Sequence, residues 1–287
     1  DRATAVHARM GPATEQSGGS VANTIAGSAD LGGSAAYIGR VSNDQLGEIF
    51  VHDMQSLGVD VRTEPAISGA PTARSHILIT PDGQRTMQTY LGACTELSVS
   101  DVTPGTVGKN EIMLLEGYVW DIPEGPALTK VAMQIGKKSG ARIALSLSDS
   151  LCVERHRDAF MAAIRNGIDM VFADEDEMLA LLQVASFDEV LSALEDFDNL
   201  FVMTRSALGS VVVHGETIFR QKAIPISKIV DTTGAGDAYT AAFLYGITQG
   251  HALNDCAKLG TWCATQVIRQ TGGRLEKDVL RDYPLTL

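Results

Sequence analysis

Short apolar segments that favour β-strands alternate with helical patterns through most of this chain. A strand, a helix and a further strand form a crossover unit, and such units build parallel sheets covered by helices on both faces. The strand candidates are 111–117, 141–148, 167–173 and 199–204, and the helical patterns between them are about 123–138, 150–165, 174–182 and 188–195. The alternation therefore predicts an α/β fold with a central, mostly parallel sheet.

One region near the N-terminal end departs from this alternation. Residues 59–93 carry strand-like patterns without a convincing helix, and a Pro-Asp-Gly sequence at 81–83 is typical of a hairpin turn. We expect this region to contribute a small antiparallel lid. Just before it, residues 34–41 favour a strand and 43–58 an amphipathic helix, for which Asp44 or the residue before it is the expected cap.

The C-terminal part combines a second antiparallel pattern with helices. Residues 209–227 form that pattern and turn at Gly215, and helical patterns follow at about 252–269 and 276–282. A chain of 287 residues fits one large α/β domain or two modest ones. Because we find no linker or repeat, we expect one domain over 1–287. The opening DRATAVHARM has no starting strand, so we also expect an N-terminal strand to be missing.

Composition excludes several classes of protein. The net charge of −12 and the pI near 4.9 argue against a nucleic-acid partner, because phosphate backbones bind to cationic surfaces. No apolar run approaches the ~20 residues that span a bilayer, and no signal peptide is visible. Few and scattered cysteines indicate buried free thiols and a cytoplasmic location. They are Cys94, Cys152, Cys256 and Cys263.

The stretch 231–250, DTTGAGDAYTAAFLYGITQG, places a carboxylate directly behind a glycine-rich turn. Gly234 and Gly236 permit a tight turn, and the unpaired N–H groups of the helix that follows favour an anion. Tyr239 stands where a dinucleotide fingerprint needs its third glycine, and no Gly-Lys-Ser/Thr completes a P-loop. Asp237 could simply cap the helix. The helix is apolar nearly all round, however, so its start lies at a buried site where ligands usually bind.

Two signatures of this chain resemble those of the PfkB-type, ribokinase-like carbohydrate kinases. DTTGAGDAYTAAF looks like their C-terminal signature, and residues 17–47, which run from SGGSVANT to GRVSNDQLG, resemble the N-terminal one. The resemblance extends over essentially the whole chain, and the GGSVANT and LLEGYVWD versions are similar to the adenosine or sugar kinase branch. It implies a three-layer α/β sandwich with a mostly parallel central sheet and a small antiparallel β lid.

The resemblance implies a phosphotransferase that uses an alcohol group as acceptor. Asp237 would be the base that takes the proton of the acceptor hydroxyl. The backbone N–H groups of Gly234, Ala235 and Gly236 would form an anion hole for the γ-phosphoryl oxygens. Consecutive residues would thus hold the base and the anion hole in a nearly fixed mutual geometry.

The N-terminal signature would bind the acceptor. Gly18 and Gly19 let the backbone approach a substrate, and the amide of Asn23 offers both a donor and an acceptor to hydroxyl groups. The alternative for Asn23 is a turn cap. Glu116 follows a strand candidate and is a further acceptor contact, with a cap or a solvated carboxylate as its alternative.

Cation sites are implied at two places. Asp174 and Glu177 match the family's N-x-x-E motif, whose glutamate helps to hold Mg²⁺, although aspartate replaces the asparagine here. The alternative is an acidic first turn that favours the helix dipole. Asp231 and Thr233 would contact a monovalent cation such as K⁺.

The nucleotide side is implied by MTRSALGSVVV, which resembles a strand followed by T-x-G-x-x-G. Thr204 and Gly209 match that pattern, whereas Ser206 replaces its first glycine. Gly272, within QTGGR, lies where the family has its adenine pocket.

We therefore expect an ATP- and Mg²⁺-dependent kinase of a sugar or nucleoside, with adenosine or a ribose-like sugar favoured. Its partner would be that small molecule, with no nucleic acid or membrane, and the family's lid suggests a homodimer. Two other classes stay open. A non-catalytic sensor on the same fold would bind without turnover, and a dinucleotide oxidoreductase is disfavoured by the missing fingerprint.

Overall fold

The central feature of the protein is a sheet of six strands in the order β10-β9-β8-β7-β6-β5. The computed structural model describes residues 11, 13–80, 83, 85–275 and 278–284. Strands β5 to β8 run parallel, and β9 and β10 are antiparallel and turn at Gly215. The strands are β5 (Ile112–Glu116), β6 (Arg142–Ser146), β7 (Met170–Asp174), β8 (Leu200–Thr204), β9 (Ser210–His214) and β10 (Thr217–Gln221). The mostly parallel sheet is thereby confirmed.

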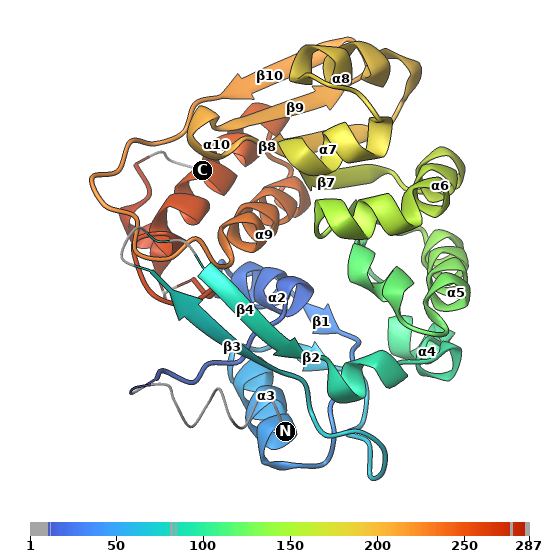
Figure 1. Cartoon of the computed structure of the whole chain (residues 1–287). Helices are drawn as coiled ribbons and strands as arrows, with labels where there is room; N and C mark the ends of the chain where they lie inside the picture. The colour runs from blue at the N-terminus through green and yellow to red at the C-terminus, as the bar shows by residue number, and fades with distance from the viewer. Residues whose placement is uncertain (1–10, 12, 81–82, 84, 276–277, 285–287) are drawn as a thin grey trace.

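Helices cover both faces of this sheet, which confirms the three-layer arrangement (Figure 1). One face carries α5 (Gly125–Ser139), α6 (Ser150–Asn166), α7 (Glu175–Leu182) and α8 (Phe187–Ala193), and the other carries α9 (Ala235–Thr248) and α10 (Leu253–Val267). Successive strand residues point to opposite faces. Leu145 packs with Phe160 of α6, for example, whereas its neighbour Ala144 belongs to the cluster of Phe243 on α9.

The N-terminal part packs beside the sheet. It comprises α2 (Ser20–Asp30), β1 (Ala36–Tyr37), α3 (Gln45–Ser56) and β2 (Asp60–Val61). The predicted helix over 43–58 is confirmed, and Asp44 caps it by accepting from the backbone N–H of Gly47. The predicted strand over 34–41 shrinks to the two residues of β1. This strand pairs in parallel with β2, so the start of the 59–93 region is not antiparallel.

The lid is an antiparallel pair of strands, β3 (Arg74–Ile79) and β4 (Arg85–Tyr90), drawn in teal across the front of Figure 1. The antiparallel prediction is confirmed for these strands. Of the predicted hairpin turn, Pro81 and Asp82 lie outside the described residues. The lid is tied to α3 where Thr72 donates its backbone N–H and its hydroxyl to the carboxylate of Asp44.

Shorter helical turns complete the chain: η1 (Gly92–Glu96), η2 (Val99–Asp101), α4 (Pro104–Val107), η3 (Gly117–Asp121), η4 (Leu194–Asp196), η5 (Ser206–Leu208) and η6 (Val279–Asp282). The helix predicted over 276–282 is a 3₁₀ turn where it is described, and Glu276 and Lys277 lie outside the described residues. Among the described helices, none has the length and apolarity that a bilayer crossing requires. All four cysteines are free, as expected; Cys152, Cys256 and Cys263 are also buried, whereas Cys94 is half-buried.

Candidate active site

Asp237 lies on the first turn of α9, the helix of the glycine-rich motif. Eight residues of α9 are buried, all of them from Ala238 onward, so the body of the helix is held inside the molecule while its first turn reaches the surface of the cleft. Gly234 is its N-cap with φ 74°, and a β-carbon there would lie 2.4 Å from Cα of Gly273. Only glycine fits this position, because it accepts both the left-handed backbone and the close contact. The motif is thereby pressed against the 270–275 segment.

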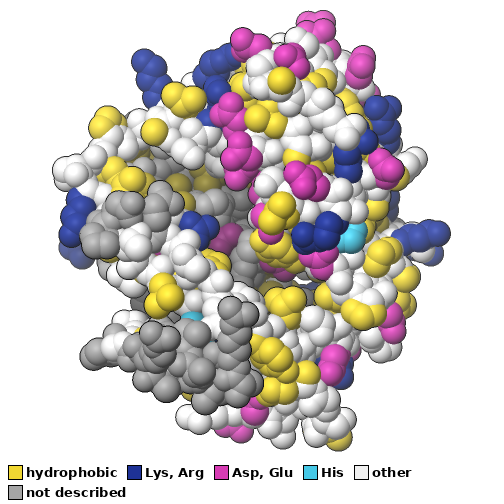
Figure 2. All heavy atoms as spheres, in the orientation of Figure 1, with side chains coloured by type: hydrophobic (Ala, Val, Ile, Leu, Met, Phe, Trp, Pro, Cys, Tyr) yellow, Lys and Arg dark blue, Asp and Glu magenta, His cyan; other side chains and the backbone are white. Residues whose placement is uncertain are grey.

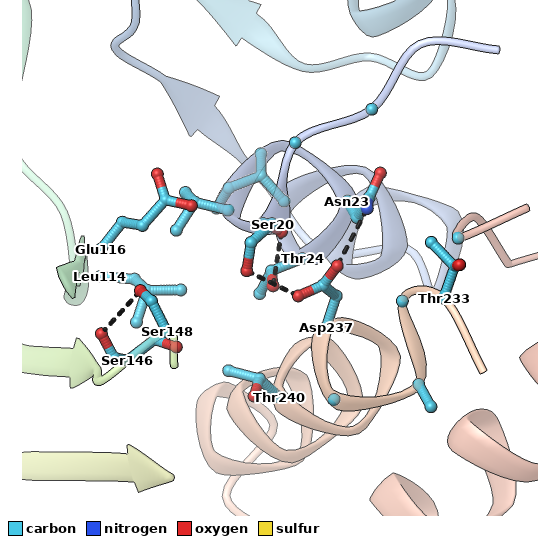
Figure 3. Close-up of a pocket in the computed structure, with 18 of the residues that line it drawn as sticks. Ser20, Asn23, Thr24, Leu114, Glu116, Ser146, Ser148, Thr233, Asp237 and Thr240 are labelled. Carbon is cyan, nitrogen blue, oxygen red and sulfur yellow. Dashed lines mark hydrogen bonds between the residues drawn. The ribbon is translucent and has the colours of Figure 1, made fainter. Parts of the chain in front are cut away.

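The Asp237 carboxylate does not cap its own helix; it faces α2 instead (Figure 3). Ser20 Oγ donates to Oδ1 at 2.7 Å, and Asn23 Nδ2 donates to Oδ2 at 2.9 Å. Burial raises the pKa of this carboxyl above its ordinary value, while the hydrogen bonds from Asn23 and Ser20 and the charge of Arg85 oppose the rise. The contacts join the two sequence signatures in one site.

The N-terminal glycines precede α2. Gly19 is the N-cap of this helix with φ 110°, a conformation that side chains other than glycine rarely adopt. Because the helix starts there, Ser20 and Asn23 lie on its first turn and reach α9. Gly18 lines the same cleft. Asn23 contacts Asp237 and Arg274, so the turn-cap alternative does not describe its side chain.

Glu116 approaches the site from the opposite side, at the end of β5. Figure 3 shows Glu116 with Ser146 and Ser148 across from Ser20 and Asp237. Burial, and then the negative charge of Asp237, raises the pKa of Glu116 to about 7. A carboxyl group in this state can either donate a hydrogen bond to a hydroxyl or accept one from it.

Asp174 and Glu177 form a reciprocal capping box at the start of α7. Glu177 N donates to Asp174 Oδ1 at 2.8 Å, and Asp174 N donates to Glu177 Oε2 at 2.9 Å. The alternative interpretation, in which these acidic residues stabilise the first turn of a helix, therefore applies to this pair. Burial, and then the charges of Asp174 and Asp149, raises the pKa of the buried Glu177 to about 8. A divalent cation coordinated by oxygen atoms fits this crowding of carboxylates, because its charge would relieve it.

The candidate nucleotide residues follow β8. Thr204 ends the strand, and Gly209 has φ 94° with a would-be β-carbon only 2.0 Å from the carbonyl oxygen of Gln221. Ser206, which replaces the family's glycine, adopts φ 48°. The replacement thus retains the left-handed backbone that glycine adopts freely, and a serine side chain is added to the turn.

Asp231 links the loop before Gly234 to the 270–275 segment through two hydrogen bonds. It is buried, its Oδ1 accepts from Thr233 N at 2.9 Å, and its Oδ2 accepts from Gly272 N at 3.0 Å. Thr233 Oγ1 is buried and has no hydrogen-bond partner within the described part of the chain. An unpartnered buried oxygen is the kind of atom that a ligand atom or a cation would satisfy.

All the residues predicted for the site line one long cleft. Figure 2 shows a hollow near the centre of the face, with acidic and hydrophobic side chains around it. The cleft is long enough to hold several subsites, and the hydrogen bonds show which of its residues are in contact. They join Asp237 to Ser20 and Asn23, and Asp231 to Thr233 and Gly272. Glu116 accepts a backbone hydrogen bond from Val21, the neighbour of Ser20, whereas Glu177 is bonded to Asp174.

Sequence reasoning missed three residues at this site. Ser20 is hidden inside the N-terminal signature. Arg85 comes from the lid, where its Nη1 donates to Thr232 Oγ1 at 2.6 Å and its charge acts on Asp237. Arg274, two residues after Gly272, donates to Asn23. Arg274 ends the QTGGR segment to which the resemblance pointed, but its contact with Asn23, like that of Arg85 with Thr232, spans more than 140 residues.

A second group of side chains lies apart from these contacts. Asp121, Cys152 and His156 are the described residues whose potential metal ligand atoms cluster. Both oxygens of Asp121 are already taken, by the Arg155 guanidinium and by His156 Nε2 at 2.6 Å. The group is an ion-pair network.

Comparison with known proteins places this geometry in a family. Residues 2–278 match the pfkB family carbohydrate kinase. The crystal structure of adenosine kinase from Sinorhizobium meliloti is 46% identical, with TM-score 0.93, over 98% of this chain and 86% of that one. A probable sugar kinase protein from Rhizobium etli CFN 42 is 44% identical, with TM-score 0.93, over 98% and 85%.

A curated relative is more distant. The 5-dehydro-2-deoxygluconokinase of Clostridium perfringens is 24% identical over 263 residues, which is 88% of this chain and 78% of that protein. The family match covers nearly the whole chain, and both signatures lie inside it. The chain belongs to the pfkB family of carbohydrate kinases.

Proposed function

We propose that this protein transfers the γ-phosphoryl group of ATP to a hydroxyl group of a nucleoside or sugar, with adenosine as the first candidate. One observation supports this most directly. Asp237 and the glycine-rich residues 234–236 that begin α9 line the same cleft, and the Asp237 carboxylate is bonded to a helix from the acceptor-type signature. Adenosine is favoured because the 46% identical structure is an adenosine kinase.

Asp237 acts as the general base in this proposal. The acceptor oxygen attacks the γ-phosphorus as its proton passes to Asp237, and the bond from that phosphorus to the bridging oxygen breaks, so that ADP leaves with the electron pair. Burial raises the pKa of Asp237, which makes its carboxylate a stronger base than an exposed aspartate. The N–H groups of Gly234, Ala235 and Gly236 stabilise the charge on the transferred group.

Glu177 and Asp174 would hold Mg²⁺, directly or through water, and the cation would neutralise charge on the phosphates. On the acceptor side, Gly18, Gly19, Asn23 and Glu116 would surround the substrate. On the nucleotide side, Thr204, Gly209 and Gly272 would contact ATP. Asp231 and Thr233 are the residues that a monovalent cation would meet.

The test is ADP release from MgATP across a panel of acceptors. The panel contains adenosine, other nucleosides, ribose, fructose and ketodeoxy sugar acids, and the phosphorylated product is identified by mass spectrometry. We expect one acceptor to give kcat/KM at least ~10²-fold above the others. Binding of a panel compound without ADP release would instead favour a non-catalytic sensor and overturn the proposal.

We further propose that two copies pair through the lid. Hydrophobic side chains of this two-stranded sheet are exposed, among them Leu78 at 48% and Met87 at 46%. An isolated pair of strands is marginally stable, so a second copy would complete it. Light scattering should give about twice the monomer mass for the wild type and the monomer mass for Leu78→Asp; a monomeric wild type would contradict the pairing.

A further inference from the structure

The 270–275 segment passes beneath both signatures of the site. Gly272 N donates to Asp231 Oδ2 at 3.0 Å, below the motif loop. A β-carbon on Gly273 would lie 3.0 Å from Asn23 Nδ2 and 3.3 Å from Cα of Gly234, so the backbone there touches both motifs. Gln270 Nε2 donates to the carbonyl oxygen of Arg274 at 2.5 Å and holds the end of this turn.

This turn delivers the side chain of Arg274 into the interior. Arg274 is 7% exposed, which is rare for arginine. Its Nε donates to Asn23 Oδ1 at 3.2 Å, and its Nη2 lies 3.5 Å from the sulfur of Met54. The residue does not line the cleft as Gly272 and Gly273 do, so it lies behind the site.

The contact sets the orientation of the Asn23 amide. An arginine side chain has only donors, so the Asn23 atom facing Arg274 must be the carbonyl oxygen. The amide nitrogen is then directed at Asp237 Oδ2, 2.9 Å away. With the amide reversed, its NH₂ group would face the guanidinium and its oxygen would face the carboxylate, and both contacts would be repulsive.

The orientation in turn distinguishes the two oxygens of Asp237. Oδ2 accepts from the Asn23 amide, which cannot rotate away without breaking its hydrogen bond to Arg274. Oδ1 is held by the hydroxyl of Ser20, which rotates freely and can yield to another donor. Oδ1 is therefore the oxygen available for the proton of an acceptor.

We propose that Arg274 is a positioning residue that acts through Asn23 and directs Oδ1 of Asp237 toward the acceptor hydroxyl. This rests on the proposed function, in which Asp237 is the base. Arg274 touches neither substrate nor phosphate in this assignment, so any effect on kcat or on the acceptor KM passes through Asn23 and should not exceed that of losing Asn23.

Kinetics of single and double variants test the linkage. Arg274→Met keeps the volume of the stem and removes the donors, and we expect kcat to fall by about tenfold, with a rise in the acceptor KM no larger than that of Asn23→Ala. Arg274→Gln can still donate to Asn23 Oδ1 and should recover part of the loss. Arg269→Met makes the same substitution at an exposed position of the same region and should change neither constant.

A double-mutant cycle separates positioning from general stability. In the Asn23→Ala background, Arg274→Met should cause no further loss of kcat, because the residue through which Arg274 acts is gone. Equal losses in both backgrounds would overturn the proposal. So would a kcat of Arg274→Met equal to that of the wild type when expressed per folded molecule.

A second measurement does not need turnover. In protein labelled with ¹⁵N-asparagine, the side-chain NH₂ signal of Asn23, assigned by its loss in Asn23→Ala, should move in Arg274→Met and in Asp237→Asn but not in Arg269→Met. An unmoved signal in Arg274→Met would overturn the linkage. A wild type that phosphorylates no acceptor would overturn the proposed function, while the NH₂ signal would still decide the contact.

Discussion

Replacing Asp237 by asparagine should separate catalysis from stability. The substitution retains the shape of the side chain. Its carbonyl oxygen can accept from Asn23 Nδ2, and its NH₂ group can donate to Ser20, whose hydroxyl rotates to accept. The variant should therefore fold with the same contacts. It lacks only the negative charge and the ability to take up a proton.

The expected loss of turnover is large. Removing a general base costs about 10²–10⁴-fold in rate, or about 2.7–5.4 kcal/mol at 1.36 kcal/mol for each factor of ten. Stability should move in the opposite direction. Burial raises the pKa of Asp237 in the folded protein, so folding disfavours its ionised form, and removing the charge relieves this cost.

Initial rates of ADP release at pH 7.5 measure the loss of turnover, and thermal unfolding at the same pH measures the change in stability. Asp158→Asn removes an exposed carboxylate, at 98% side-chain exposure, and serves as the control for the loss of one charge. Turnover of Asp237→Asn within tenfold of the wild type would refute the assignment of the base. A Tm lowered by more than about 4 °C, which corresponds to roughly 1 kcal/mol or more, would refute the account of its contacts.

Three further changes test other parts of the site. Because the pKa of Glu177 is raised from 4.5 to about 8, the metal-free protein should lose stability as the pH rises between these values. We also expect Mg²⁺ to raise the Tm of the wild type. In thermal melts, Glu177→Gln should remove both this rise and the loss of stability with increasing pH. Arg85→Ala loses the bond to Thr232 and removes a positive charge that acts on Asp237. It should therefore lower kcat by about 10²-fold in initial-rate assays. Gly234→Ala should cost more than about 2 kcal/mol in urea unfolding, because its β-carbon would lie 2.4 Å from Gly273.

Each of these variants has a matched control. Asp176→Asn changes an exposed neighbour of Glu177, and an equal response of both variants would remove Glu177 from the metal site. Arg74→Ala removes a lid arginine that stacks on Tyr90, and an equal loss of kcat would assign the effect to the lid as a whole. A β-carbon on Gly236 meets nothing within 4 Å, so Gly236→Ala should unfold as the wild type does.

The sequence was sufficient to predict the sheet and its covering helices. Strands β5 to β8 are short, apolar on both faces and separated by helices, and this pattern is determined by local residues and by burial. The prediction of a strand over 34–41 was wrong for most of its length, because local residues do not determine which partner a strand finds. Only Ala36 and Tyr37 find a partner, and that partner is β2 rather than a strand of the large sheet.

The site could be predicted only as far as its motifs extend. Asp237 and the glycines were located because the motif that carries them is compressed into consecutive residues. Ser20, Arg85 and Arg274 were not found, since each owes its place to packing between distant segments. Asn23 illustrates both cases. Its place in the motif located it from the sequence, whereas its contact with Arg274 is visible only in the structure.

The pairing of α2 with α9 joins positions 217 residues apart, Ser20 and Asp237. During synthesis the segment that carries Ser20 therefore leaves the ribosome long before the one that carries Asp237, and a chain terminated between them would lack the carboxylate that we propose as the base. After denaturation, recovery of turnover should trail recovery of helix content, because the most remote contact is among the slowest to form.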